Sequence, residues 1–263
     1  MVVRRPSFAG MFYPDDPHEL SSLMEFFLSR SRGVDDCYGV VAPHAGYPYS
    51  GKVQGSSYAC IPPAFSGTFL VIGPSHAGYP ICTSTVDWGT PLGVIESDKD
   101  LCRLLGIPVS DEAMIARENS LEVQMPFIRY RFPGAKVAPV LMGYQDFGSA
   151  MDLAERVIEA LDAYAGDIRI IASSDFSHYI PDAVARADDQ YVIDALHNLN
   201  TEEFYKRLAE KKLTACGYGP IAVLAESCRH LGATEGRLIE YATSGDVTGD
   251  FDQVVGYASI AAV

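Results

Sequence analysis

Short, continuous runs of apolar residues alternate along this chain with segments whose apolar residues recur at helical spacing. The runs at 39–42, 69–72, 137–142, 168–172, 238–242 and 254–261 are typical of buried strands. The helical segments cover about 17–30, 50–60, 149–164, 182–198, 201–211 and 219–231. A strand without polar alternation must be covered on both faces. The pattern therefore predicts an α/β fold with a mainly parallel sheet flanked by helices on both faces.

The middle of the chain is less regular, but no linker interrupts it. Residues 88–95 predict a strand or hairpin, 98–105 a short helix, and 118–131 a helix that Pro126 must kink or end. No stretch rich in proline, glycine or serine marks a domain boundary. A length of 263 residues suits one large core. We therefore expect a single domain over residues 1–263.

Acidic residues outnumber basic ones by 34 to 20, which gives a formal net charge of −14. Nucleic acids and anionic membrane surfaces attract proteins through Lys and Arg, so this balance argues against both as partners. No apolar run approaches about 18 residues, the minimum for a spanning helix. Arg4 and Arg5 are followed by no apolar stretch that would form a signal peptide. The six scattered cysteines form no Cys-x-x-Cys pair, so we expect reduced thiols and a cytoplasmic protein.

Three of the six histidines follow predicted strands, at the edge of the sheet where α/β proteins bind their ligands. The pentapeptide His-Ala-Gly-Tyr-Pro occurs twice, at 44–48 and 76–80, about one strand–helix–strand unit apart. Its small residues allow the backbone to approach whatever the imidazole holds. Because histidine is the commonest metal ligand, we predict that His44 and His76 bind a metal ion. The alternative is two similar turns in which the histidines cap carbonyl groups.

Cys216 differs from the other five cysteines, which we expect to pack as small apolar residues. It lies beside glycines, just before the helix predicted near 219, and a helix N-terminus stabilises a thiolate. With His44 and His76 it completes a set of three ligands with an open position for substrate or dioxygen, which is typical of catalytic metal centres. Taken alone, Cys216 would be interpreted as a small buried cysteine at a tight turn.

Asp175 and His178 share the segment Ser-Ser-Asp-Phe-Ser-His, which follows a predicted strand. An acid beside an imidazole fixes its tautomer for proton transfer, so we predict His178 as the acid or base and Asp175 as the group that orients it. Alternatively, Asp175 caps the next turn and His178 is exposed. Glu118, Glu122 and Gln124 form a polar patch that either approaches the same site or faces solvent.

Several segments, in this order along nearly the whole chain, carry a resemblance to one family. The segments are 5–14, 42–47, 73–79, 90–93, 120–126, 173–178 and 215–217. They resemble the Memo-like family, called AmmeMemoRadiSam system protein B in prokaryotes. The resemblance implies a fold similar to the LigB-type class III extradiol dioxygenases and a metal site at His44, His76 and Cys216, with Asp175 and His178 nearby. It also implies iron or copper, since a thiolate stands where the dioxygenases carry a carboxylate and is the softer ligand.

One position departs from the family pattern. The family usually has Glu-His-Ser where this chain has Glu118-Asn119-Ser120. Asn119 cannot exchange a proton, although its amide can still donate a hydrogen bond.

These residues support three functional hypotheses. The first is a metal-dependent oxidoreductase, dioxygenase-like, that acts on an unknown small molecule. The second is a non-catalytic adaptor that binds a peptide or protein in the same cleft, rimmed by Tyr47, Tyr49 and Tyr79. The third is a zinc hydrolase with His178 as the base. Walker loops, Gly-x-Ser-x-Gly and His-Glu-x-x-His are absent from the sequence, so nucleotide binding and the common hydrolase designs are not leading hypotheses.

Overall fold

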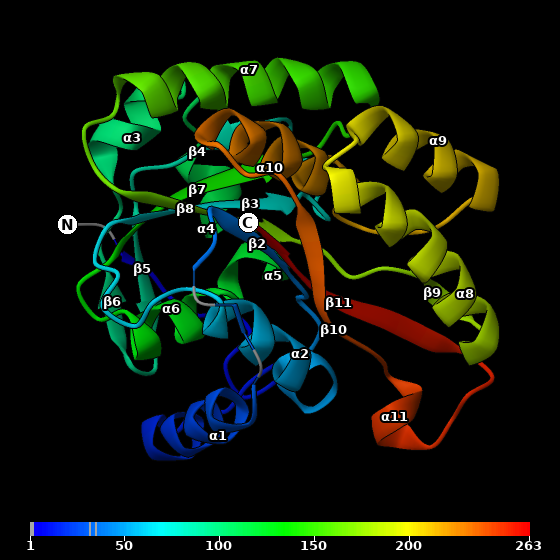
Figure 1. The fold of residues 1–263 in the computed structure, drawn as a ribbon. Helices are drawn as coiled ribbons and strands as arrows, with labels where there is room; N and C mark the ends of the chain where they lie inside the picture. The colour runs from blue at the N-terminus through cyan, green and yellow to red at the C-terminus, as the bar shows by residue number, and fades with distance from the viewer. Residues whose placement is uncertain (1–2, 32, 35) are drawn as a thin grey trace.

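The computed structural model describes residues 3–31, 33, 34 and 36–263, and in it strands alternate with helices (Figure 1). The strands are β1 (Val3–Arg4), β2 (Gly39–Ala42), β3 (Thr68–Pro74), β4 (Cys82–Thr83), β5 (Asp87–Thr90), β6 (Gly93–Ile95), β7 (Lys136–Met142), β8 (Ile168–Ser173), β9 (His178–Ile180), β10 (Gly236–Thr243) and β11 (Val254–Ala262). The helices are α1 (Pro17–Arg30), α2 (Tyr47–Ala59), α3 (Lys99–Leu104), α4 (Asp111–Ile115), α5 (Asn119–Glu122), α6 (Met125–Arg131), α7 (Phe147–Ala163), α8 (Asp182–Ile193), the 3-10 helix η1 (Asp194–Asn198), α9 (Thr201–Lys211), α10 (Tyr218–Leu231) and α11 (Gly245–Thr248).

The main sheet is mixed, with the strand order β10-β11-β2-β8-β3-β7-β4, and β9 pairs with β11. The four central strands β2, β8, β3 and β7 are parallel to one another. The pairings at the two flanks, β10 with β11, β11 with β2 and β4 with β7, are antiparallel. The predicted α/β class with helices on both faces is therefore confirmed, while parallel pairing is confined to the centre of the sheet.

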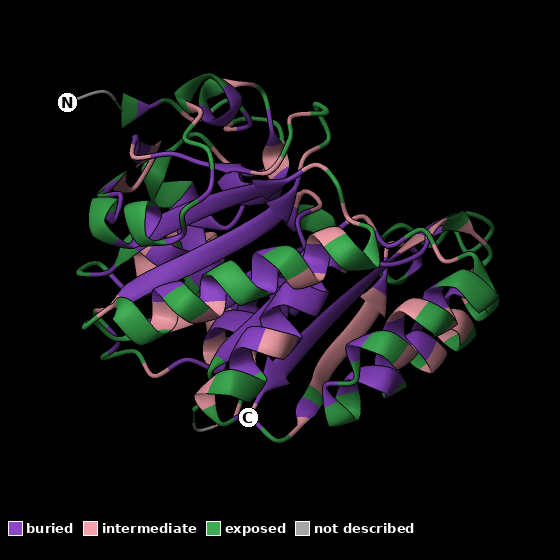
Figure 2. Cartoon of the chain, turned by 90° about the horizontal axis from the view of Figure 1, so that it is seen from above, coloured by how far each residue is buried: buried purple, intermediate pink, exposed green. Residues whose placement is uncertain are grey.

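Alternate residues of each central strand enter two different cores, one on each face of the sheet. In β3, Leu70 and Ile72 belong to the core beneath α7, α9 and α10, whereas Phe69 and Val71 face α1, α2 and α6. Figure 1 shows α7 and α10 above the sheet and α1 and α2 below it. All four side chains are fully buried, and each such burial contributes about 1.5–3 kcal/mol. Figure 2 shows the same layering, with buried strands beneath helices whose exposed residues face outward.

Local signals in the sequence place several helix ends correctly. Asp16 caps α1 by accepting the N–H groups of His18 and Glu19, each at 2.9 Å, and Pro17 is the first helical residue. Pro126 divides the segment predicted at 118–131, because α5 ends at Glu122 and α6 begins at Met125. The elements that the sequence pattern missed are short, namely β1, β4, β9, α4 and α11.

A second, three-stranded sheet of β1, β5 and β6 lies beside the main one. Its anchor is Arg4, whose guanidinium is only 2% exposed and bonds to the Glu122 carboxylate at 2.6 Å and to the Met114 and Glu118 carbonyls. These contacts tie the N-terminal strand to α4, to α5 and to the residue that caps α5. Among the described residues, no helix combines the length and the apolar character that a bilayer span requires.

Candidate metal centre

The predicted site residues lie beyond the carboxyl ends of three neighbouring strands. His44 follows β2, Asp175 follows β8 and His76 follows β3, and these strands are adjacent in the order β2-β8-β3. Because parallel neighbours end at the same edge of a sheet, the three loops meet there. Cys216 approaches the same point from the loop before α10.

His44 is buried, and its hydrogen bonds fix the imidazole tautomer. Its Nδ1 lies 2.9 Å from the Ser173 hydroxyl, which donates its own proton to the Ser120 carbonyl at 2.5 Å. Ser173 also accepts an N–H from the buried Gln124 amide at 2.8 Å. The hydroxyl has no second proton, so His44 Nδ1 must carry the hydrogen and Nε2 keeps a free lone pair. Burial lowers the pKa of His44 to about 4, so this lone pair stays available at neutral pH.

His76 is exposed and is held by a carboxylate instead. Its Nδ1 lies 2.8 Å from Glu118 Oε1, and its backbone N–H donates to Glu118 Oε2 at 2.6 Å. Burial opposes ionisation of Glu118, but the His76 contacts and the Ser120 N–H outweigh it and lower the pKa of Glu118 to about 2. The carboxylate can only accept, so Nδ1 of His76 donates and Nε2 is the free ligand atom. The Glu118 hydrogen bond raises the pKa of His76 above its usual value.

Cys216 contacts both of the strand loops that follow β2 and β8. Its Sγ lies 3.1 Å from His44 Nε2 and accepts the Asp175 backbone N–H at 3.2 Å. Burial, and then the charge of Asp175, raise the pKa of the Cys216 thiol well above its usual value. The sequence-based expectation of a stabilised thiolate is therefore wrong for the chain without a cation, because desolvation outweighs the adjacent helix N-terminus. The other five cysteines are buried free thiols, as expected.

One ligand atom each from His44, His76 and Cys216 all lie within 4.8 Å of one another. The two imidazole rings are nearly perpendicular, with centroids 5.3 Å apart. Ligand atoms at about 2.0–2.3 Å from a shared ion fall within such separations. His44 is buried, Cys216 is half-buried and His76 is exposed, so the group reaches solvent at His76.

His178 and Asp175 lie close together, but Asp175 does not orient the ring. A second group of ligand atoms, from Asp175, His178 and Cys216, also falls within 4.8 Å. The Nδ1 of His178 instead contacts the Thr214 carbonyl at 2.9 Å, and its backbone N–H donates to the Thr214 hydroxyl. Asp175 Oδ1 accepts the backbone N–H of His44 at 2.8 Å. The Thr214 carbonyl is thus the group that sets the His178 tautomer, with Nε2 unprotonated in the neutral ring.

The three polar residues at 118, 122 and 124 are all buried, so the solvent-facing alternative is wrong for each, and only two of them approach the site. Glu118 and Gln124 reach the site through His76 and Ser173, whereas Glu122 binds Arg4, Tyr13 and two N-terminal backbone N–H groups away from it. Ser173 was not predicted, and a hydroxyl at the end of a strand gives no sequence signal of such a role.

Asn119 stands beside the site and acts as a donor. Its amide donates to the His44 carbonyl at 3.2 Å, which supports the loop after β2. The expected rim of tyrosines is only partly present. Tyr47 is wholly buried and donates its hydroxyl to the Val123 carbonyl, while Tyr49 is 45% exposed.

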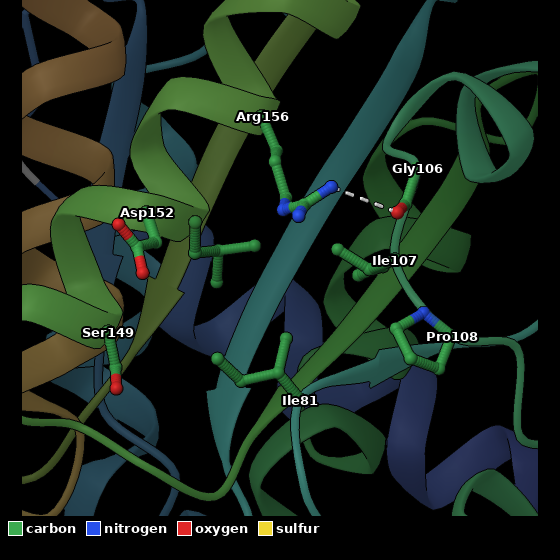
Figure 3. Close-up of a pocket in the computed structure, with 8 residues that line it drawn as sticks. Ile81, Gly106, Ile107, Pro108, Ser149, Asp152 and Arg156 are labelled. Carbon is green, nitrogen blue, oxygen red and sulfur yellow. Dashed lines mark hydrogen bonds between the residues drawn. The ribbon is translucent and has the colours of Figure 1, made fainter.

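A separate cavity of about 240 Å³ lies between α7 and the loop after α3 (Figure 3). Arg156 crosses it to bond the Gly106 carbonyl at 3.1 Å, and Ile81 and Ile107 form part of its wall. None of its lining residues belongs to either group of side chains that could hold a metal ion.

Comparison with known proteins gives a consistent result. A family model described as "Memo-like protein" matches residues 4–261. A "MEMO1 family protein" of Methanococcoides burtonii is 41% identical over 264 residues, covering 98% of this chain and 99% of the relative. A protein of the same name from Methanosarcina acetivorans is 42% identical over 269 residues, covering 99% of each. An uncharacterized Escherichia coli protein, JW3007, aligns with 12% identity and a TM-score of 0.46 over 77% of this chain and 88% of that one, which is too weak a likeness to support an inference.

Proposed function

The chain belongs to the Memo-like protein family, and from that premise we propose that it is a metal-binding redox protein. In this proposal His44, His76 and Cys216 hold one iron or copper ion, and a small substrate approaches it from the solvent side. The observation that supports the proposal is that three candidate ligand atoms from separate loops lie within 4.8 Å of one another. The hydrogen bonds of Nδ1 in His44 and His76 leave Nε2 of each imidazole free to bind an ion.

The chemistry of the donor set fits such an ion. Two neutral imidazoles and one thiolate form a borderline-to-soft set, which suits iron(II), copper(I) and zinc more than hard cations. Three protein ligands leave positions open, as catalytic sites require. The hydrogen bonds from Nδ1 of His44 and His76 to a hydroxyl and a carboxylate are the outer support that ligating histidines ordinarily have.

The bound ion would supply one-electron redox chemistry and a point of attachment for the substrate. The surrounding residues would then do the positioning and the proton transfer. His178 has its Nδ1–H committed to the Thr214 carbonyl, so its Nε2 is the atom that takes or gives a proton. Asn119 and Gln124 hold the His44 and Pro43 carbonyls, and thereby fix the loop that carries the first ligand.

We also infer a cytoplasmic location. All six cysteines are free, and five of them are buried where they pack as small apolar residues. A reducing compartment keeps such thiols unoxidised and keeps Cys216 available as a ligand.

Anaerobic reconstitution with iron(II) and with copper(I) tests the assignment. We expect tightly bound metal that is lost in Cys216→Ser and in His44→Ala and retained in His197→Ala, a matched change at an exposed histidine. Metal content by mass spectrometry after gel filtration is the measurement. Equal retention of metal by all three variants would overturn the ligand set.

Oxygen consumption separates the redox proposal from the two rivals. We expect the iron- or copper-loaded protein to reduce dioxygen in the presence of ascorbate, and the Cys216→Ser variant to lose this reaction. Metal binding without any oxygen consumption would favour the adaptor. Ester or amide hydrolysis by the zinc-loaded protein alone would favour the hydrolase.

A further inference from the structure

The second group of ligand atoms, Asp175, His178 and Cys216, shares its sulfur with the first. We propose that this group is a second cation position, so that the Cys216 thiolate bridges two metal ions. The proposal rests on the function proposed above and extends it, because it gives Asp175 and His178 a binding role that the single-ion site leaves unassigned. Each position would take a borderline divalent ion such as iron(II), cobalt(II) or zinc(II).

The first argument is that Asp175 is a buried acid without a cationic partner among the described residues. Its exposed fraction is 5%, similar to the 3% of Glu118 and the 1% of Glu122. Glu118 pairs with His76 and Glu122 pairs with Arg4. Within the described part of the chain, Asp175 forms no ion pair and accepts only the His44 N–H, through Oδ1. A buried carboxylate without a counter-charge is costly unless it is paired or binds a metal ion.

His178 is the second argument, because its free nitrogen is held in place. The ring donates Nδ1–H to the Thr214 carbonyl, and the backbone N–H is held by the Thr214 hydroxyl. The residue begins β9 and pairs with Val255 of β11. The next residue, Tyr179, adopts φ +59°, an unusual left-handed conformation for a bulky side chain. These constraints fix the direction of the imidazole, as a metal-ligating histidine requires.

The position of the sulfur is the third argument. Cys216 Sγ lies 3.1 Å from His44 Nε2 on one side and 3.2 Å from the Asp175 backbone nitrogen on the other. Its Sγ is therefore a member of both groups of candidate ligand atoms. A thiolate has lone pairs for two cations, and losing its proton to metal ions removes the cost that burial imposes on a free thiolate.

The two roles of His178 exclude each other at any one moment. When its Nε2 binds a second cation, that nitrogen cannot exchange a proton. The second ion would therefore convert a working site into a blocked one, and excess metal would inhibit.

An anaerobic titration with cobalt(II) tests the bridge. Equilibrium dialysis with metal analysis gives the stoichiometry, and the thiolate-to-cobalt absorption band reports sulfur ligation. We expect two cobalt ions per wild-type chain, with the band rising over both equivalents. Asp175→Asn, which keeps the size of the side chain, and His178→Ala should each bind one ion. His197→Ala should still bind two, and Cys216→Ser should show no sulfur band.

The outcomes separate this inference from the proposed function. One ion per wild-type chain, lost in His76→Ala and unchanged in His178→Ala and Asp175→Asn, would overturn the second position and leave the first intact. One ion that His178→Ala removes and His76→Ala spares would overturn both the bridge and the original ligand set. Circular dichroism of each variant establishes that a lost ion reflects a lost ligand and not an unfolded chain.

Discussion

The same pentapeptide, His-Ala-Gly-Tyr-Pro, occupies two loops of this molecule and behaves differently in each. At 44–48 it leads into α2, Gly46 has φ −58° and the histidine is buried against a neutral hydroxyl. At 76–80 it leads into an irregular segment, Gly78 has φ +80° and the histidine is exposed against a carboxylate. The strand before each loop brings the imidazole to the same edge of the sheet. The hydrogen-bond partner of each imidazole, a hydroxyl for His44 and a carboxylate for His76, then determines whether the ring favours its neutral or its charged form.

Among the changes that compare the two loops, removal of either imidazole should have the largest effect on metal affinity. If both loops supply ligands, His44→Ala and His76→Ala should each weaken iron(II) affinity by more than the roughly 100-fold that loss of an outer partner can cause. Competition with a chromophoric chelator measures the change. A normal affinity in only one of the two variants would show that the loops are not equivalent as ligand donors.

The second largest difference between the two loops should be in the proton affinity of their histidines, His44 and His76. In the metal-free chain, burial should keep His44 neutral until the pH falls to about 4, while Glu118 should hold the proton on His76 above the usual pKa of histidine. The two imidazoles should therefore titrate in clearly different pH ranges, His44 below and His76 above the usual pKa of histidine. NMR titration of the imidazole C–H signals measures both. Coincident titration curves would contradict the assigned partners.

Changes to the partners should have an intermediate effect. Glu118→Gln removes a charged acceptor, so metal affinity should fall by roughly 10–100-fold. Ser173→Ala removes a neutral acceptor and should lie near the lower end of that range. Isothermal titration calorimetry with zinc(II) measures both, and His197→Ala, at an exposed histidine that pairs with Glu235, serves as the control. A larger loss in Ser173→Ala than in Glu118→Gln would reverse the proposed ranking.

Substitution of the glycine in each pentapeptide should give the smallest difference, and that difference should be in thermal stability. Serine at position 78 must adopt φ +80°, which costs about 1 kcal/mol for a residue with a side chain and lowers Tm by roughly 2–4 °C. Serine at position 46 keeps an ordinary φ, finds its nearest neighbour at 3.6 Å from Cβ and occupies a favourable helix cap. Differential scanning calorimetry of Gly78→Ser and Gly46→Ser should therefore show a loss only in the first.

The positions of the candidate ligands could be predicted from the sequence, but their protonation states and hydrogen-bond partners could not. His44, His76 and Asp175 follow apolar runs that form parallel neighbours, so periodicity and topology alone bring them together. The protonation of Cys216 depends on how deeply α10 and its preceding loop are packed, which no local pattern reports. The pairing of His178 with Thr214 joins residues 36 positions apart, and the sequence offered Asp175 as the nearer partner.

Burial of tyrosines was equally hard to predict. Tyr47 and Tyr79 occupy the same position in the repeated pentapeptide, yet Tyr47 is the first residue of α2 and lies in a core with Phe127 and Phe27. Tyr79 remains partly exposed in its loop. The difference arises from the elements that pack around each pentapeptide, and only the assembled sheet determines those neighbours.

The contact between His44 and Cys216 joins residues 172 positions apart in the chain. During synthesis the first ligand leaves the ribosome long before the sulfur does, at about 5–20 residues per second. For roughly 7–28 seconds the two histidine loops exist without Cys216, because 140 residues separate His76 from it. The loops that carry His44 and His76 can therefore form before Cys216 is present, and the group of three candidate ligand atoms is complete only after Cys216 has emerged.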